Sequence, residues 1–215
     1  MGGFSDVDVE AAIVDLDTVF SGELRASIVA AYFAAWRTWT RNILRYLPVC
    51  PTRTARSVVW ALVLAEVRAR LSDSPDVIFK ETKQGHFFLI VPGGKKVKSI
   101  LVRFKYLDQE LHTHNYPTQT SIEYDEQMPL PGIPPGIRVS VGYRPNQDET
   151  AITGVFAVWS VGLQKLWVRE LDKVAADVTP VLPITPIVKP TDQPRRTKVK
   201  DELNKDKKED PSSEK

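Results

Sequence analysis

The sequence predicts an α+β fold, with N-terminal helices packed on a mostly antiparallel sheet of about six strands and a disordered C-terminal tail. Up to residue 75, apolar residues recur every three to four positions, as they do along one face of a helix. Between residues 76 and 171 they recur at every second position, as they do on a strand with one buried face. Because the helices precede the strands instead of alternating with them, we expect an α+β arrangement and not a doubly wound sheet.

Three helices are expected before the sheet. The first begins near Ser5, whose hydroxyl can cap it, and ends before Gly22. The second spans about residues 23–47 and contains IVAAYFAAW, which is apolar nearly all round and therefore predicts burial on two sides. Thr52 can cap the third helix, which spans about residues 53–71.

Six strands and one short helix are expected after residue 76. The strand ranges are 77–81, 86–91, 99–106, 137–144, 151–159 and 164–171. In the third strand Ile100 and Val102 share one face, while Arg103 and Lys105 share the other, which is the alternation of a half-buried antiparallel strand. The short helix is expected at residues 118–127, between the third and the fourth strand.

The composition changes near residue 178. Residues 1–75 and 76–177 are expected to form one domain, whose first part is helical and whose second part is the sheet. In residues 178–215, five prolines lie from Pro180 to Pro194, and a run rich in lysine and acidic residues follows. Because this stretch has almost no apolar surface to bury, we expect it to be disordered.

Length and composition fit a globular cytoplasmic protein. The chain has 215 residues, of which 42% are hydrophobic, and this is enough for a sizeable core. Its single cysteine, Cys50, excludes an intrachain disulfide and fits a reducing compartment. The longest apolar runs fall well short of the roughly 20 residues that span a bilayer, so no membrane span is expected.

Charges are sorted along the N-terminal half. Residues 1–21 carry five acids and no base, whereas residues 22–72 carry eight arginines and two glutamates. Arg37, Arg41 and Arg45 recur every fourth residue and so form one stripe on the second helix, here called the Arg stripe. The acidic first helix can neutralise this stripe within the fold, or the acidic segment can repel an outside ligand.

A second basic surface is expected on the sheet. Arg103, Lys105, Arg138 and Arg144 lie at alternate positions of the third and fourth strands, which predicts that they share one sheet face. Phosphate binding needs several positive charges together, and this face and the Arg stripe supply them. Nucleic-acid binding is therefore one expected function.

Two patterns contain the residue types of metal-dependent chemistry, but neither has the usual spacing. Residues 75–83 contain the residue types of a PD-(D/E)xK nuclease, but one strand would hold them all, with Asp76 and Glu81 on opposite faces. His112 and His114 form an H-x-H pattern, which chelates zinc only with two further ligands. No nucleotide-binding glycine motif or nucleophile motif is present. We therefore expect no catalytic residue, metal or cofactor.

The stretch from about residue 50 to residue 171 resembles a known family, more loosely in the helical segment at residues 52–71. The matching pieces are Arg103-Phe104-Lys105, Leu107-Asp108, Asn115-Tyr116-Pro117-Thr118, Leu130-Pro131-Gly132 and Val141-Gly142-Tyr143-Arg144. Together they resemble a family of uncharacterised bacterial and phage proteins, often encoded beside a regulator that joins a helix-turn-helix domain to an ImmA/IrrE-type metallopeptidase. Such gene pairs look like toxin–antitoxin or phage-defence modules. The resemblance implies a protein partner and assigns no catalytic residue.

The leading prediction is a non-enzymatic protein-interaction component of a bacterial or phage toxin–antitoxin, regulatory or phage-defence module. The partner that the resemblance implies is the helix-turn-helix and metallopeptidase regulator. The residues expected to contact a partner or nucleic acid are Arg37, Arg41, Arg45, Arg103, Lys105, Asn115, Tyr116 and Arg144. The alternatives are nucleic-acid binding through the arginine-rich helix face and a divergent metal-dependent nuclease.

Overall fold

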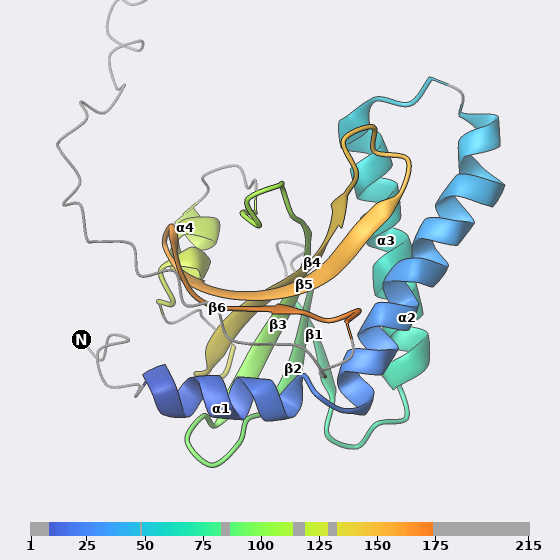
Figure 1. The fold of residues 1–215 in the computed structure, drawn as a ribbon. Helices are drawn as coiled ribbons and strands as arrows, with labels where there is room; N and C mark the ends of the chain where they lie inside the picture. Colours follow the sequence, from blue (N-terminus) through green and yellow to red (C-terminus); the bar gives the residue numbers. More distant parts are fainter. Residues whose placement is uncertain (1–8, 48, 83–86, 114–118, 129–132, 174–215) are drawn as a thin grey trace, which may run out of the picture. The chain divides into compact units, whose positions relative to one another are not determined.

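The structure is a computed structural model, and it describes residues 9–47, 49–82, 87–113, 119–128 and 133–173. The chain divides into two units, Met1–Asp177 and Val178–Lys215, and all the described residues belong to the first. Helices lie on both sides of a single sheet in this unit (Figure 1). The tail predicted at residues 178–215 lies outside the described residues.

Four α-helices are described: α1 (Val9–Val19), α2 (Glu23–Thr38), α3 (Thr52–Leu71) and α4 (Gln119–Asp125). The three predicted N-terminal helices and the short helix before the fourth strand are therefore confirmed. The predicted cap of the third helix is wrong, because the helix already includes Thr52, and Pro51 precedes it without a capping side-chain hydrogen bond. Pro51 suits this boundary, since its lack of an N–H leaves no donor unsatisfied.

The second helix changes its geometry where one continuous helix to residue 47 was expected. A π-helical turn (Trp39–Ile43) and a 3-10 turn (Leu44–Tyr46) follow α2. The Thr40 hydroxyl donates a hydrogen bond to the Trp36 carbonyl oxygen at 3.0 Å. The Ser57 hydroxyl makes the same bond to the Arg53 carbonyl oxygen within α3, which stays α-helical, so this bond accompanies the departure from α geometry and does not by itself cause it. The chain therefore stays helical to Tyr46, close to the predicted end at residue 47, but only its first part is α-helical.

The sheet has six strands in the order of the sequence. The strands are β1 (Ile78–Glu81), β2 (Phe87–Pro92), β3 (Ser99–Tyr106), β4 (Ile137–Pro145), β5 (Ile152–Val161) and β6 (Gln164–Glu170). All neighbouring pairs are antiparallel except β3 and β4, which are parallel. A parallel pair needs a crossover connection, and the segment that contains α4 supplies it. The predicted α+β fold with about six mostly antiparallel strands is confirmed.

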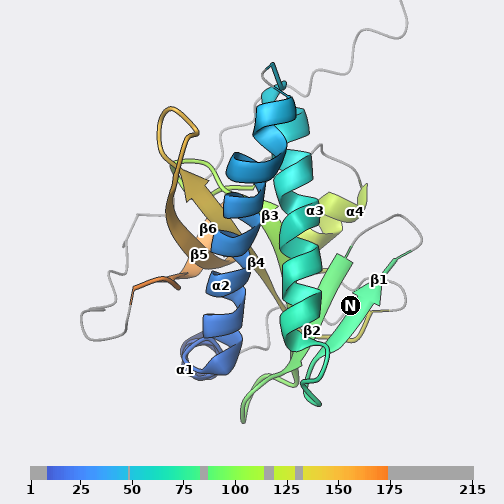
Figure 2. The same ribbon diagram turned by 90° about the vertical axis from the view of Figure 1, so that its right-hand side faces the viewer.

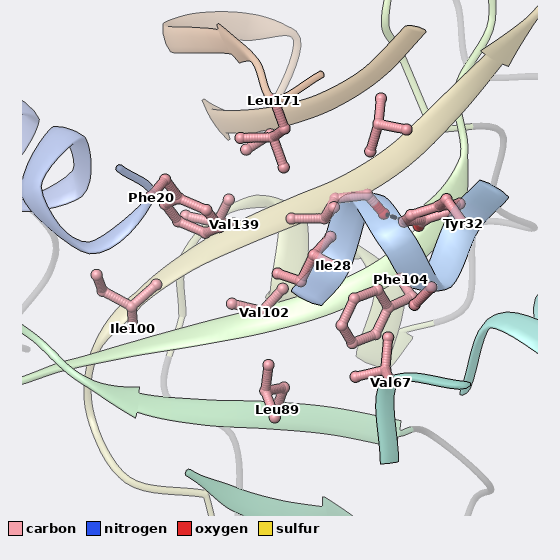
Figure 3. Packing of buried hydrophobic residues seen from close by; sticks show 14 of the residues in the cluster. Phe20, Ile28, Tyr32, Val67, Leu89, Ile100, Val102, Phe104, Val139 and Leu171 are labelled. Atoms are coloured by element: carbon pink, nitrogen blue, oxygen red, sulfur yellow. Dashed lines mark hydrogen bonds between the residues drawn. The ribbon is translucent and has the colours of Figure 1, made fainter. Parts of the chain in front are cut away.

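The main core lies between α1, α2, α3 and one face of the sheet (Figures 2 and 3). Its members occur at every second position of the strands, as predicted for Ile100 and Val102, which share one face of β3. Large buried members are Phe20, Ile28, Val67, Leu89, Ile100, Val102, Phe104, Val139 and Leu171. The Tyr32 hydroxyl, also buried here, donates a hydrogen bond to the Val141 carbonyl at 2.8 Å. This bond joins α2 to the middle of β4.

The opposite face of the sheet is covered in part by α4. Tyr124 of α4 stacks on Phe88 of β2, with ring centroids 5.7 Å apart, and packs with Ile90 and Leu101 in a smaller apolar cluster. In the part of the chain that the structure describes, no helix combines the length and the apolar character that a membrane span requires.

Candidate interaction surface

The turn between α2 and α3 presents a group of exposed side chains, here called the hairpin tip. Its members are Arg41, Leu44, Arg45, Tyr46, Leu47, Val49 and Arg53. The two helices run side by side along the sheet, and the turn that joins them lies at the upper right in Figure 1. The 3-10 turn in this segment has no buried residue. The tip is therefore open to a partner.

The Arg stripe continues from α2 into the hairpin tip. Arg37, Arg41 and Arg45 are all exposed, and none of the ion pairs among the described residues includes them. Four residues of an α-helix advance by about 40° beyond one turn. A π-turn has more residues per turn, so the one at Trp39–Ile43 reduces this advance and favours the alignment of the three side chains.

Two acids of the first helix, Asp15 and Asp17, have partners other than the Arg stripe. Asp15 accepts hydrogen bonds from the backbone amides of Lys95, Lys96 and Val97, at 3.0, 2.7 and 2.9 Å. These bonds hold the pKa of Asp15 below its ordinary value. Asp17 pairs instead with Arg169 of β6 at 3.0 Å. The expectation of pairing between the first helix and the stripe is therefore wrong for these two acids.

The hairpin tip also exposes apolar side chains, which the sequence reasoning missed. Tyr46 is 70% exposed and Val49 is 91% exposed, and Leu44 and Leu47 are exposed as well. The Arg45 guanidinium lies over the Tyr46 ring, 4.6 Å from its centroid, and donates to its hydroxyl at 2.7 Å. Clustered exposed apolar residues mark interaction sites. The sequence signal was the run of apolar residues between Ile43 and Pro51 that has no helical or strand period.

The predicted basic face of the sheet is largely buried, which corrects the expectation of a phosphate-binding surface. Arg103 and Arg138 are each only 5% exposed. Arg103 donates to Asp125 at 3.0 Å, and its guanidinium lies 3.7 Å from the centroid of the Tyr124 ring. Arg138 donates to the carbonyl oxygens of Glu123 and Tyr124. Both arginines hold α4 on the sheet.

The other two basic residues of this face are only partly accessible. Arg144 lies over the Phe156 ring at 4.8 Å, and its Nε donates to the Thr153 hydroxyl at 3.3 Å. Lys105 is half-buried, and burial and the neighbouring Arg103 lower its pKa to about 8. Asn115 and Tyr116 lie outside the described residues. Of the eight predicted contact residues, the structure brings together the three of the Arg stripe on one exposed surface.

Neither proposed metal constellation is completed by the described residues. Among them, no group of three or more His, Cys, Asp and Glu side chains could hold a metal ion. His112 Nδ1 lies 3.5 Å from a Glu110 carboxylate oxygen and 3.9 Å from one of Asp108. His114 and Lys83, which the zinc and nuclease patterns include, lie outside the described part of the chain.

Comparison of the chain with protein-family models, with curated proteins and with solved structures finds no match. The resemblance described from the sequence therefore stays a prediction.

Proposed function

We propose that the protein acts by binding a protein partner through its hairpin tip, as one component of a bacterial or phage toxin–antitoxin, regulatory or phage-defence module. The observation that carries the proposal is the exposure of Leu44, Tyr46, Leu47 and Val49 beside arginines that have no acidic partner among the described residues. Exposed apolar residues are unfavourable in water, so their clustering favours a surface that becomes covered.

The chemistry of the tip indicates the chemistry of the partner. Tyr and Arg are enriched at protein–protein interfaces, and both occur here in direct contact, as Tyr46 and Arg45. The partner surface that fits is an apolar groove with carboxylates at its rim, because the Arg stripe supplies three positive charges that have no ion-pair partner within the described ranges. The module itself is supported by the family resemblance, which implies a regulator as the partner.

The proposal is tested by measuring binding to the product of the neighbouring regulator gene by calorimetry. Tyr46→Ala and Leu47→Ser are each expected to weaken the complex at least about tenfold, since central apolar and aromatic anchors contribute about 2 kcal/mol or more and about 1.4 kcal/mol is tenfold. The matched control is Leu163→Ser, because Leu163 is also exposed but lies at the turn between β5 and β6. Full affinity of the tip variants, or no complex with the wild-type chain, would contradict the proposal.

Nucleic-acid binding is the second candidate, and the observation that favours it is the exposed Arg stripe, for which no described acid forms an ion pair. This function predicts an affinity that falls steeply with salt, with a slope of about 0.9 per phosphate contact on a log–log plot. Changing Arg37, Arg41 and Arg45 together to Ala should then reduce the steepness of this slope by up to about 2.7, which is the contribution of three phosphate contacts. If no binding to nucleic acid is measured, or if the affinity does not change with salt, this candidate function is excluded.

A further inference from the structure

A small pocket lies where the helical hairpin meets the ends of β3 and β4. Its lining includes four aromatic rings and one ion pair: Trp36, Trp39, Tyr106, Tyr143, Arg56 and Glu149. The cavity has a volume of about 30 Å³. This is room for one small polar group but not for a ring. The pocket, here called the aromatic pocket, is separate from the hairpin tip.

Two hydrogen-bond donors of the aromatic pocket have no acceptor among the described residues. Tyr143 is only 4% exposed and lines the pocket, and none of the side-chain hydrogen bonds between described residues includes its hydroxyl, although Arg56 Nε is the one lining atom found fully enclosed without a partner among them. Burial raises the pKa of Tyr143, so the hydroxyl keeps its proton and can donate it. Arg56 Nε is buried and likewise has no acceptor. The Tyr143 hydroxyl is therefore a donor that a ligand in the pocket can satisfy.

The charges of the aromatic pocket balance each other. Arg56 pairs with Glu149 at 2.5 Å, and its guanidinium lies 3.7 Å from the centroid of the Tyr106 ring. Glu149 has a positive φ of 52°, in the left-handed region that is uncommon for residues other than glycine. Because the ion pair is already neutral, an entering anion would place an uncompensated charge in this partly buried site. A neutral group that both accepts and donates fits better.

We propose that the aromatic pocket binds a neutral carboxamide. Its carbonyl oxygen accepts from the Tyr143 hydroxyl, its NH₂ group donates to the Glu149 carboxylate, and its plane lies against the aromatic rings. The carboxamide belongs either to a small molecule or to the side chain of an Asn or Gln of another protein. This inference does not depend on the proposed function of the hairpin tip.

The first test titrates the full chain with acetamide and follows the indole N–H signals of Trp36 and Trp39 by NMR. We expect saturable shifts, and Tyr143→Phe is expected to weaken binding at least about fivefold, since it removes one hydrogen bond but keeps the ring. Tyr46→Phe is the matched control, because Tyr46 lies at the hairpin tip. The unfolding temperatures of both variants are measured as well, and values close to that of the wild-type chain exclude misfolding as the cause of a lost signal.

Three outcomes would overturn the proposal. One is equal binding of acetamide by the wild-type chain and by Tyr143→Phe. Another is binding of acetate as tight as that of acetamide, since the argument requires a neutral group. The third is a crystal grown with acetamide that holds only an ordered water at the Tyr143 hydroxyl.

The two sources of a carboxamide are distinguished with blocked amino acids. N-acetyl-glutamine N-methylamide carries a side-chain carboxamide, and N-acetyl-alanine N-methylamide lacks it but has the same backbone amides. Tighter binding of the glutamine compound than of acetamide, with no binding of the alanine compound, assigns the pocket to a protein side chain. Binding of acetamide alone assigns it to a small molecule.

Discussion

At the scale of single residues, the Asp15 side chain joins α1 to the loop between β2 and β3. Its carboxylate is nearly buried and accepts three consecutive backbone N–H groups from the loop between β2 and β3. A Cβ atom at Gly94 would lie 2.0 Å from the Asp15 carboxylate, so this loop closes on the acid only because residue 94 is a glycine. The contact fixes α1 to the sheet.

The first prediction is that Asp15→Asn lowers the free energy of unfolding by about 2–4 kcal/mol, because an amide cannot accept as many charge-assisted hydrogen bonds in the same geometry. Urea denaturation at pH 7 measures it. The matched control is Glu10→Gln, since Glu10 is an exposed acid of the same helix. A loss as large in Glu10→Gln would show that net charge, and not the loop contact, is responsible.

The same residue predicts a pH dependence. The folded-state pKa of Asp15 is lowered, so its contribution is fully present above the unfolded pKa of about 3.9. The contribution is lost as the pH falls through the folded pKa, because the acid is then protonated in both states. The stability difference between the wild-type chain and Asp15→Asn should therefore shrink below about pH 4. A difference that stays constant down to pH 2 would contradict the assignment.

Lys105 gives a second prediction, in which a substitution raises the free energy of unfolding instead of lowering it. Burial, and then the neighbouring Arg103, lower its pKa to about 8, so folding penalises the charged ammonium at neutral pH. Lys105→Met should raise the free energy of unfolding by about 1–3 kcal/mol at pH 7. The gain should fall at pH 9.5, since the wild-type lysine is by then mostly neutral in the folded state.

Urea denaturation at both pH values checks this prediction. Lys80→Met is the control, because Lys80 is an exposed lysine of β1. Its substitution should change stability by less than about 0.5 kcal/mol at either pH. A gain of Lys105→Met that is equal at pH 7 and pH 9.5 would point to packing and not to charge.

At the scale of elements, α4 depends on the sheet for its existence. It has seven residues, which is too short for a stable isolated helix. Tyr124 joins it to the sheet through the Phe88 ring, and the Tyr124 hydroxyl lies 3.3 and 3.2 Å from the carbonyl oxygens of Leu101 and Val139. Arg138 also holds the helix, since it donates to carbonyl oxygens at the C-terminal end of α4.

The third prediction is that Tyr124→Ala detaches α4, with a loss of about 3–5 kcal/mol in the free energy of unfolding. Tyr124→Phe keeps the ring stack and should lose only about 1 kcal/mol. Hydrogen exchange should show fast exchange at residues 119–125 in Tyr124→Ala while the amides of β5 stay protected. Slow exchange of α4 in Tyr124→Ala would mean that other contacts hold the helix.

The helices and strands could be predicted from the sequence, whereas the role of α4 could not. Alternation placed Ile100 and Val102 in the core correctly. The same alternation placed Arg103 and Arg138 on an exposed face, because polar residues opposite a core normally face water. A crossover helix covers this face, and its carbonyl oxygens and Asp125 accept hydrogen bonds from the arginines. Burial of this kind depends on a segment far away in sequence, which periodicity does not reveal.

At the scale of the whole molecule, we expect one set of residues to determine stability and another set to determine partner binding. The core residues are buried between the sheet and α1–α3, whereas the members of the hairpin tip contribute little buried surface. The sequence did not predict this tip, because apolar residues such as Leu47 and Val49 are normally expected inside. Their exposure at a turn bounded by prolines is therefore better explained by a partner than by folding.

The last prediction follows from this separation. The double variant Tyr46→Ser with Leu47→Ser should change the free energy of unfolding by less than about 1 kcal/mol, while Phe104→Ala should lose about 3–5 kcal/mol. The double variant should nevertheless lose the partner in a capture experiment with the tagged full chain, performed with and without nuclease. A partner protein that survives nuclease with the wild-type chain and is lost with the double variant agrees with association through the tip. A large loss of stability in the double variant would instead show that Tyr46 and Leu47 stabilise the fold. This result would contradict the proposal that the exposed tip is a binding surface.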